Sequence, residues 1–129
     1  MRRVLLVEDN EDNARALTRL LARRGYDMVT AGTGADAVRL AFEAKPDVIL
    51  MDIGLPDFDG LEATRRIKAN PECAAIPVIA LTAHALIEDQ RAALGAGCVN
   101  FSPKPVNLPS LLSLISAALE SQREQHDGN

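Results

Sequence analysis

Five side chains that could carry out chemistry follow short apolar runs in four separate segments of the chain. They are two adjacent acids, a third acid, a hydroxyl and an amine, namely Glu8, Asp9, Asp52, Thr82 and Lys104. If the apolar runs are neighbouring parallel strands, all five side chains meet at the edge formed by the carboxyl ends of the strands. Three carboxylates, one hydroxyl and one ammonium at a single edge suit a magnesium-assisted phosphoryl acceptor.

The three carboxylates indicate a hard divalent cation. Carboxylates packed within a few ångströms repel one another unless a cation or protons lie between them. Magnesium takes oxygen ligands, keeps several waters and uses one or two protein carboxylates together with phosphate oxygens. The set formed by Glu8, Asp9 and Asp52 is rich in oxygen and contains no histidine. We therefore expect Mg2+, with Mn2+ as a possible substitute, rather than zinc.

Asp52 is the expected nucleophile. A carboxylate can attack phosphorus and form an aspartyl phosphate if the phosphoryl charge is neutralised and the reacting atoms are held in line. Glu8 and Asp9 would hold the cation, Lys104 would place its charge against a phosphoryl oxygen, and Thr82 would donate its hydroxyl to another. Each residue alone is unspecific, because a carboxylate after a strand often caps a helix. Their joint placement carries the prediction.

The elements that must position these residues alternate between short apolar, β-branched runs and longer segments of helical periodicity. The first helical stripe begins at Ala14 and stops at Gly25. The expected strands are residues 4–7, 27–31, 48–51, 77–81 and 99–102, and the later helices are 35–44, 59–69, 86–94 and 108–121. Such alternation predicts an α/β fold with parallel strands, right-handed crossovers and helices on both faces. We expect a flavodoxin-like, doubly wound (βα)5 sandwich with the strand order 2-1-3-4-5.

Length and composition fit one domain, which we place at residues 1–121, followed by a polar tail at 122–129. The chain has 129 residues, 47% of them hydrophobic but only 3% aromatic, so the core should be aliphatic. The net charge of −4 argues against direct nucleic-acid binding. No apolar run approaches the ~20 residues that span a bilayer, so we expect no membrane insertion and a cytoplasmic location. Cys73 and Cys98 are too few for a disulfide framework and are expected to be buried thiols.

The chain resembles the response-regulator receiver domain, the phosphoacceptor part of two-component signalling, over almost its whole length. The matching motifs are VLLVEDN with Glu8 and Asp9, DVILMDIGLPDFDG with Asp52, IPVIALTAHA with Thr82, and PKPV with Lys104. The resemblance implies that Asp52 receives a phosphoryl group from a histidine kinase or a histidine phosphotransfer protein. It implies no enzyme activity beyond self-catalysed phosphorylation and dephosphorylation.

The resemblance also implies roles for residues around this set. Phe101 matches the switch aromatic residue that moves together with Thr82, Gly54 would lend its backbone carbonyl to the metal, and the Lys104–Pro105 peptide would be cis. His84 falls at a rim position that can affect how readily water reaches the phosphoryl group, and an exposed residue near the start of the fourth helix is the alternative. Glu8 stands where an aspartate is more frequent in the family. The glutamate side chain is one methylene longer, but it still offers carboxylate oxygens to a metal.

Two surfaces are candidates for partner binding in a monomer or weak dimer. Arg15, Arg19 and Arg23 recur every fourth residue, and the resemblance implies that this helix contacts the phosphodonor protein. In the last helix, Ser110, Ser113 and Ala117 form a neutral face opposite the apolar stripe, and no charged residue occurs between residues 105 and 119. This face is a candidate for docking a downstream target, and a merely solvated serine-rich helix is the alternative.

Other functions remain open on the sequence alone. A magnesium-dependent phosphohydrolase with an aspartate nucleophile would carry a general-acid Asp two residues after Asp52, where this chain has Gly54. A flavin or nucleotide binder would want a glycine- and serine-rich phosphate cradle after the first strand, where Glu8 and Asp9 stand instead. A docking module of the same fold that is never phosphorylated is a further alternative. The position of Met1 and the polar tail favour a free-standing protein over the terminal receiver of a longer one.

Overall fold

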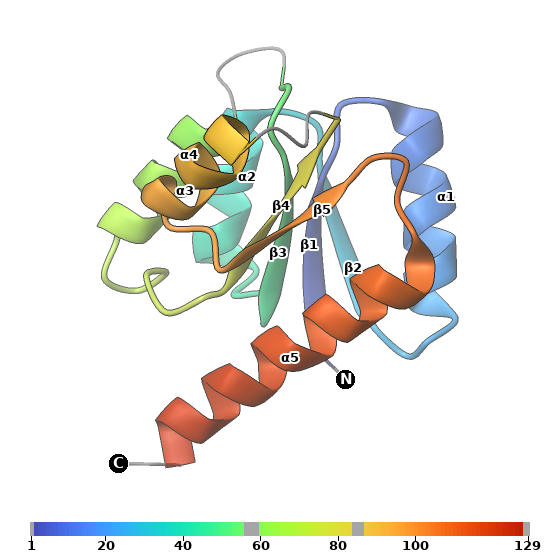
Figure 1. Cartoon of the computed structure of the whole chain (residues 1–129). Helices are drawn as coiled ribbons and strands as arrows, with labels where there is room; N and C mark the ends of the chain where they lie inside the picture. Colours follow the sequence, from blue (N-terminus) through green and yellow to red (C-terminus); the bar gives the residue numbers. More distant parts are fainter. Residues whose placement is uncertain (1, 56–59, 84–86, 128–129) are drawn as a thin grey trace.

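The computed structural model describes residues 2–55, 60–83 and 87–127, without the side chains of 87–89 and 122–127. Five strands and five helices alternate along this part of the chain (Figure 1). The strands are β1 Arg3–Val7, β2 Asp27–Ala31, β3 Val48–Asp52, β4 Val78–Thr82 and β5 Asn100–Pro103. The helices are α1 Glu11–Ala22, α2 Gly34–Glu43, α3 Gly60–Ala69, α4 Ile87–Ala96 and α5 Leu108–Asp127.

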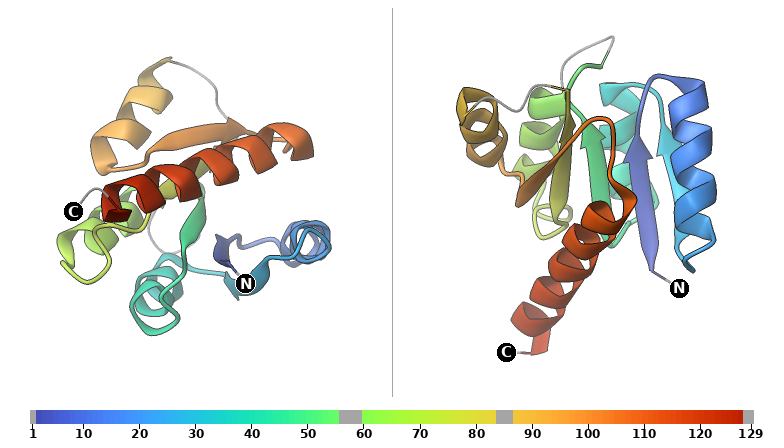
Figure 2. Two further views of the ribbon diagram at one scale, coloured as in Figure 1. Left: turned by 90° about the horizontal axis from the view of Figure 1, so that it is seen from below. Right: turned by 45° about the vertical axis from the view of Figure 1, so that its right-hand side comes forward.

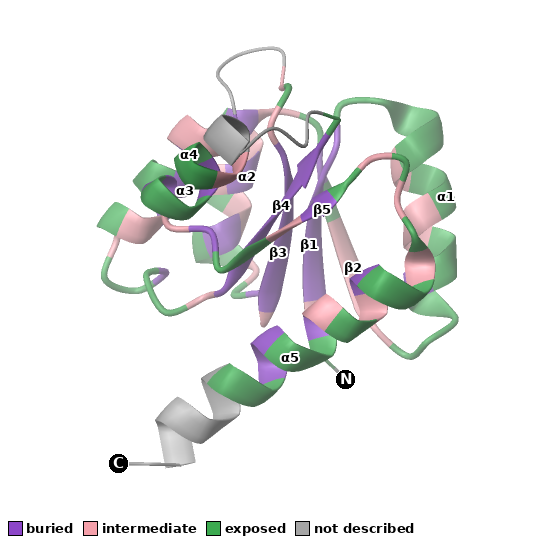
Figure 3. Cartoon of the chain, viewed as in Figure 1, coloured by how far each residue is buried: buried purple, intermediate pink, exposed green. Residues whose placement is uncertain are grey.

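The strands form one parallel sheet in the order β2-β1-β3-β4-β5, as the sequence predicted. All residues of β3 and β4, and all of β1 except its first, are buried (Figure 3). This burial explains why these strands read as continuous apolar runs, since a central parallel strand is covered on both faces. The edge strands β2 and β5 are more exposed.

Two aliphatic clusters fill the two faces of the sheet. One packs beneath α2, α3 and α4 and uses small residues such as Ala37, Ala41 and Ala63. The other packs beneath α1 and α5 through Leu21 and Ile115, among others. The right-hand view of Figure 2 shows α2, α3 and α4 together on one side and α1 on the other. The thiols of Cys73 and Cys98 are buried, at 2% and 5% exposure, as expected.

Local capping chemistry fixes where the helices begin. The side chain of Asn10 accepts a hydrogen bond from the backbone N–H of Asn13, and Thr33 and Asn107 do the same for α2 and α5. Such caps satisfy amides at a helix start that have no partner within the helix. Gly25, at φ +93°, lies in the turn after α1, where the sequence predicted that the helix stops.

The observed boundaries differ from the predicted ones chiefly at the end of the chain. Most strands and helices begin or end one or two residues away from the expected position. The last helix was expected to stop at Ser121, but α5 continues to Asp127. The residues in between include good helix formers and neither Gly nor Pro, so nothing in the sequence stops the helix there. No helix of the described residues has the length and apolar character needed to cross a bilayer.

Candidate phosphoacceptor and metal site

The sheet register brings the ends of four strands to one rim. Val7 pairs with Met51, Asp52 with Leu81, and Thr82 with Pro103. The residues that end or follow β1, β3, β4 and β5 therefore meet at the carboxyl edge of the sheet, at the top of Figure 1. This is the edge where open parallel sheets bind their ligands.

Glu8, Asp9 and Asp52 form an acidic cluster at this rim. Each offers a carboxylate oxygen, and these oxygens all lie within 4.8 Å of one another. Glu8 and Asp52 are only 7% and 5% exposed, whereas Asp9 is exposed and leaves the cluster open to solvent on one side. Carboxylates so close and so buried repel one another strongly. A donor set of oxygen alone fits Mg2+, which prefers carboxylates and retained waters to nitrogen or sulfur ligands.

Lys104 is the counter-ion of the cluster. Its Nζ lies 3.0 Å from Glu8 Oε2 and 3.0 Å from Asp52 Oδ2. Burial by itself lowers the pKa of the Lys104 ammonium, but the hydrogen bonds to Glu8 and Asp52 outweigh burial and raise this pKa above its ordinary value of 10.5. The amine therefore carries a full positive charge at neutral pH, where it can neutralise an anionic group beside Asp52.

The backbone after β3 holds the Asp52 side chain in place. The N–H of Gly54 donates to Asp52 Oδ1 at 3.1 Å. Gly60, the first residue of α3, packs so closely that a methyl group on its Cα would overlap the carbonyl oxygen of Asp52. Sequence reasoning missed this role of Gly60. The only signal was a glycine near the start of the helix, which is weak because glycine is also common at helix starts for other reasons.

Asn13 is a second residue that the sequence analysis did not single out. Its Nδ2 donates to Glu8 Oε1 at 3.3 Å, so α1 orients one of the cluster's carboxylates. Its position one helical turn after Glu8-Asp9-Asn10 could have suggested such a contact.

Thr82 and Lys104 are linked through the backbone as well as by position. Thr82 ends β4 and is 6% exposed, and its carbonyl oxygen accepts a hydrogen bond from the N–H of Lys104 at 2.7 Å. Phe101 on β5 is half-buried and packs against the cluster beneath α2, α3 and α4. The peptide bond between Lys104 and Pro105 is cis.

The remaining candidates lie on the surface or outside the described residues. Arg15 and Arg19 on α1 and Arg23 just after its end are exposed, and Arg15 contacts Asp12 at 3.8 Å. On α5 the candidate face is exposed, at Ser110, Ser113 and Ala117. The opposite face is buried through Leu111, Ile115 and Leu119. His84 lies outside the described residues.

The fold and the acidic rim define a class of signalling phosphoacceptors, and comparison with known proteins agrees. The family model of the response regulator receiver domain matches residues 4–116. This chain therefore belongs to the response regulator receiver domain family, whose members act in two-component signalling.

Individual relatives cover nearly the whole chain. The polar-differentiation response regulator DivK of Brucella anthropi is 40% identical over 116 residues, which are 90% of this chain and 94% of DivK. The receiver domain of the sensor histidine kinase PA1611 from Pseudomonas aeruginosa PAO1 has a TM-score of 0.86 at 37% identity, covering 92% of this chain and 98% of that one. That structure has a magnesium ion coordinated in its active-site cleft. The chemotaxis protein CheY4 of Vibrio cholerae has a TM-score of 0.87 at 27% identity, over 92% and 99% of the two chains.

Proposed function

We propose that Asp52 is the phosphoacceptor of this receiver domain and that Glu8, Asp9 and Asp52, with the Gly54 carbonyl, hold Mg2+. The observation that carries the proposal is the convergence of three carboxylates and the Lys104 ammonium at one rim. Mn2+ would serve in place of Mg2+, since it accepts the same oxygen ligands. When bound, the cation neutralises phosphoryl oxygens and helps to orient the phosphoryl group for transfer.

Asp52, Gly54 and Lys104 would have different roles in phosphoryl transfer. A carboxylate oxygen of Asp52 forms a bond to phosphorus while the bond from phosphorus to the phosphohistidine nitrogen breaks, and the histidine ring leaves with that electron pair. The Gly54 N–H and the Lys104 ammonium, which contact the two carboxylate oxygens of Asp52, keep its side chain oriented before the reaction. Lys104 is close enough to move its charge from Asp52 Oδ2 to a phosphoryl oxygen.

Thr82 and Phe101 would turn phosphorylation into a conformational signal. A hydrogen bond from Thr82 to the phosphoryl group contributes about 1.5–3 kcal/mol net. Moving a population from 1:99 to 99:1 takes about 5.5 kcal/mol of differential affinity. One contact is therefore too weak to shift the population by itself. The domain must already have two conformational states of similar free energy, and Phe101 on β5 and the region of α4 would repack together when it switches between them. His84 would tune access of water to the phosphoryl group.

The partners would be a histidine kinase or histidine phosphotransfer protein on one side and a target protein on the other. The exposed arginines of α1 favour an acidic face on the phosphodonor, and the uncharged face of α5 is a candidate site for the target. We infer a cytoplasmic protein that is monomeric or weakly dimeric, binds no nucleic acid directly and turns over no substrate.

Phosphorylation with a small-molecule donor tests this function. With Mg2+ and acetyl phosphate, we expect the wild type to gain a labile phosphoryl adduct, detected by intact-protein mass spectrometry. Asp52→Asn should gain none, because an amide is not nucleophilic in this way, and Asp36→Asn on α2 should behave like the wild type. An adduct on Asp52→Asn would contradict the assignment. Steady turnover of many phosphate esters would favour a phosphohydrolase instead.

A further inference from the structure

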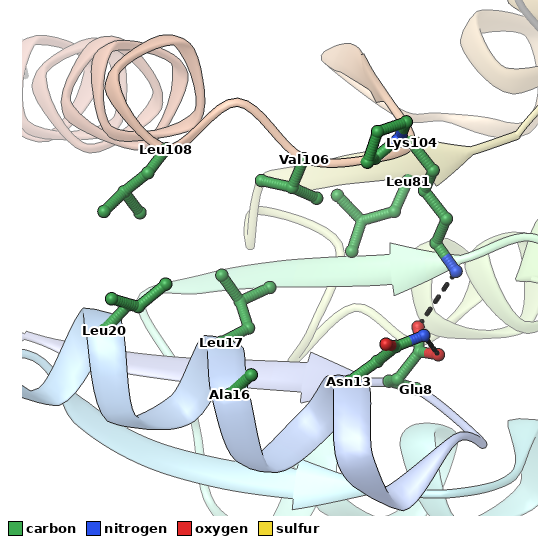
Figure 4. Close-up of a pocket in the computed structure, with 10 residues that line it drawn as sticks. Glu8, Asn13, Ala16, Leu17, Leu20, Leu81, Lys104, Val106 and Leu108 are labelled. Atoms are coloured by element: carbon green, nitrogen blue, oxygen red, sulfur yellow. Dashed lines mark hydrogen bonds and ion pairs between the residues drawn. The ribbon is translucent and has the colours of Figure 1, made fainter.

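A pocket of about 270 Å3 lies between α1 and the segment that leads from β5 into α5 (Figure 4). Its walls are mostly apolar and are contributed by Ala16, Leu17, Leu20, Leu81, Val106 and Leu108. In Figure 4 the side chains of Leu17 and Leu20 rise from α1 toward Val106 and Leu108. A space of this size suits a small organic molecule better than a single ordered water.

The apolar walls are incompletely covered by the chain itself. Leu20 is 39% exposed although it lines the pocket, and Leu17, Val106 and Leu108 are only partly buried. A molecule with an apolar body would remove this surface from water, which is the main driving force for filling such a cavity.

One end of the pocket is polar and is formed by Glu8, Asn13 and Lys104. The Lys104 ammonium has three N–H donors, and Glu8 and Asp52 accept two of them. The Asn13 side chain uses its Nδ2 to donate to Glu8, which leaves its carbonyl oxygen as an acceptor. A group that offers one acceptor and one donor therefore matches this end.

The charges and hydrogen-bonding groups at this end favour a neutral head group over an ionic one. The carboxylates of Glu8, Asp9 and Asp52 outnumber the single ammonium of Lys104, so a further carboxylate would be repelled. An alkylammonium offers donors only, so it could not accept the remaining N–H of Lys104 and would place a like charge beside it. A neutral hydroxyl or primary amide avoids both, and it adds no charge that must be desolvated.

From these features we infer that the pocket between α1 and the β5–α5 segment binds a small neutral molecule with an apolar body and an amide or hydroxyl head. The body lies between Leu17, Leu20 and Val106, and the head accepts from Lys104 and donates to Asn13. Binding itself does not depend on phosphorylation. The effect of binding on phosphorylation does rest on the proposed function: a ligand that accepts a hydrogen bond from Lys104 would keep this amine from a phosphoryl group on Asp52.

Titration of the 15N-labelled protein with hexanamide tests the inference. We expect saturable NMR shifts at the amides of Ala16, Leu20 and Val106, with a dissociation constant in the millimolar range that is usual for so small a ligand. Hexanoate and hexylamine should have dissociation constants at least about tenfold higher than that of hexanamide, which corresponds to about 1.4 kcal/mol of binding free energy. Comparable affinity for hexanoate would overturn the charge argument.

A pair of alanine variants locates the binding. Ala16 and Ala22 are both exposed on α1, but only Ala16 lines the pocket. Ala16→Leu should fill the cavity and weaken hexanamide binding about tenfold or more, whereas Ala22→Leu should leave it unchanged. Equal binding by both variants, or no saturable shift in the wild type, would refute the pocket. Phosphorylation by acetyl phosphate, measured on the same samples, shows separately whether the proposed function holds.

Discussion

At the scale of single residues, Lys104 has two tasks that oppose each other. Its ammonium lies 3.0 Å from carboxylates of both Glu8 and Asp52, which are the groups proposed to hold Mg2+. The amine therefore stabilises the acidic cluster when no cation is bound, and it competes with a cation for the same oxygens. Under the proposed function, the same charge would neutralise a phosphoryl group on Asp52.

Removing this charge should separate the two tasks. Lys104→Gln is expected to lower the Mg2+ dissociation constant about fivefold, because a unit charge near these carboxylates is worth about 1 kcal/mol or more at water-like screening. Phosphorylation by acetyl phosphate should become slower in the same variant. Magnesium titration followed by NMR measures the first effect, and Lys45→Gln removes an equal charge from the loop after α2 as a control. Weaker Mg2+ binding in Lys104→Gln would contradict the competition.

Gly60 helps to position Asp52, the proposed phosphoacceptor, by packing closely against its backbone. A methyl group there would overlap the carbonyl of Asp52, so Gly60→Ala must displace either the start of α3 or the end of β3. We expect a loss of about 1–3 kcal/mol in the free energy of unfolding, typical of overpacking, together with weaker Mg2+ binding. Gly95→Ala on α4 is the control, because a Cβ at Gly95 meets no atom within 4 Å. It should be neutral or stabilising by up to about 1 kcal/mol, as measured by urea denaturation.

At the scale of elements, Lys68 ties α3 to two neighbouring connections. Its Nζ donates to the backbone carbonyls of Ala74, at 3.0 Å, and Ile76 in the segment before β4. Its aliphatic stem lies against Gly97, at φ +114°, in the turn between α4 and β5. Burial lowers the pKa of this ammonium, although the nearby Cys98 acts in the opposite direction. The two carbonyls satisfy its buried N–H donors.

Lys68→Met keeps the stem over Gly97 and removes only the donors. The two carbonyls would lose their partner, so we expect the free energy of unfolding to fall by about 1–3 kcal/mol in urea denaturation. Lys45→Met, at an exposed position, should change it by less than about 0.5 kcal/mol. A neutral result for Lys68→Met would mean that water replaces the ammonium at both carbonyls.

The elements themselves were predictable because their apolar patterns are unambiguous. Short continuous runs such as Val48–Met51 are typical of strands buried on both faces, and Gly25 ends α1 where its stripe stops. The end of α5 was not predictable, because polar residues beyond Ser121 are as compatible with a helix as with a tail. The helix beginnings depended on caps such as Asn10 and Thr33, whose side-chain bonds could not be distinguished from other local turns.

At the scale of the whole molecule, the convergence at the rim follows from the strand order alone. Once β1, β3, β4 and β5 are neighbours, Glu8, Asp52 and Lys104 must lie close together, and this much the sequence could predict. The close approach of Gly60 and the contact from Asn13 depend on how helices pack against that rim. Such packing depends on side-chain volumes across several elements, which no local pattern contains.

The buried thiol of Cys98 makes the free energy of unfolding of the whole domain decrease with rising pH in the alkaline range. Burial raises the pKa of Cys98 above its ordinary value of 9.0, although a contact with Thr64 and the nearby Lys68 act in the opposite direction. The unfolded chain therefore releases this proton first as pH rises, and the native state loses stability relative to it above about pH 9. The loss cannot exceed about 1.4 kcal/mol per pH unit for one thiol.

Urea denaturation of the wild type and Cys98→Ala between pH 7 and pH 10 tests this dependence. We expect the free-energy difference between the two proteins to be constant below pH 8 and to shrink above pH 9, because only the wild type carries the thiol at position 98. Cys73 is present in both proteins, and its own buried thiol cancels in the comparison. A difference that stays constant to pH 10 would mean that the native state ionises Cys98 as readily as the unfolded chain does, and that its surroundings beneath α3 and α4 admit water.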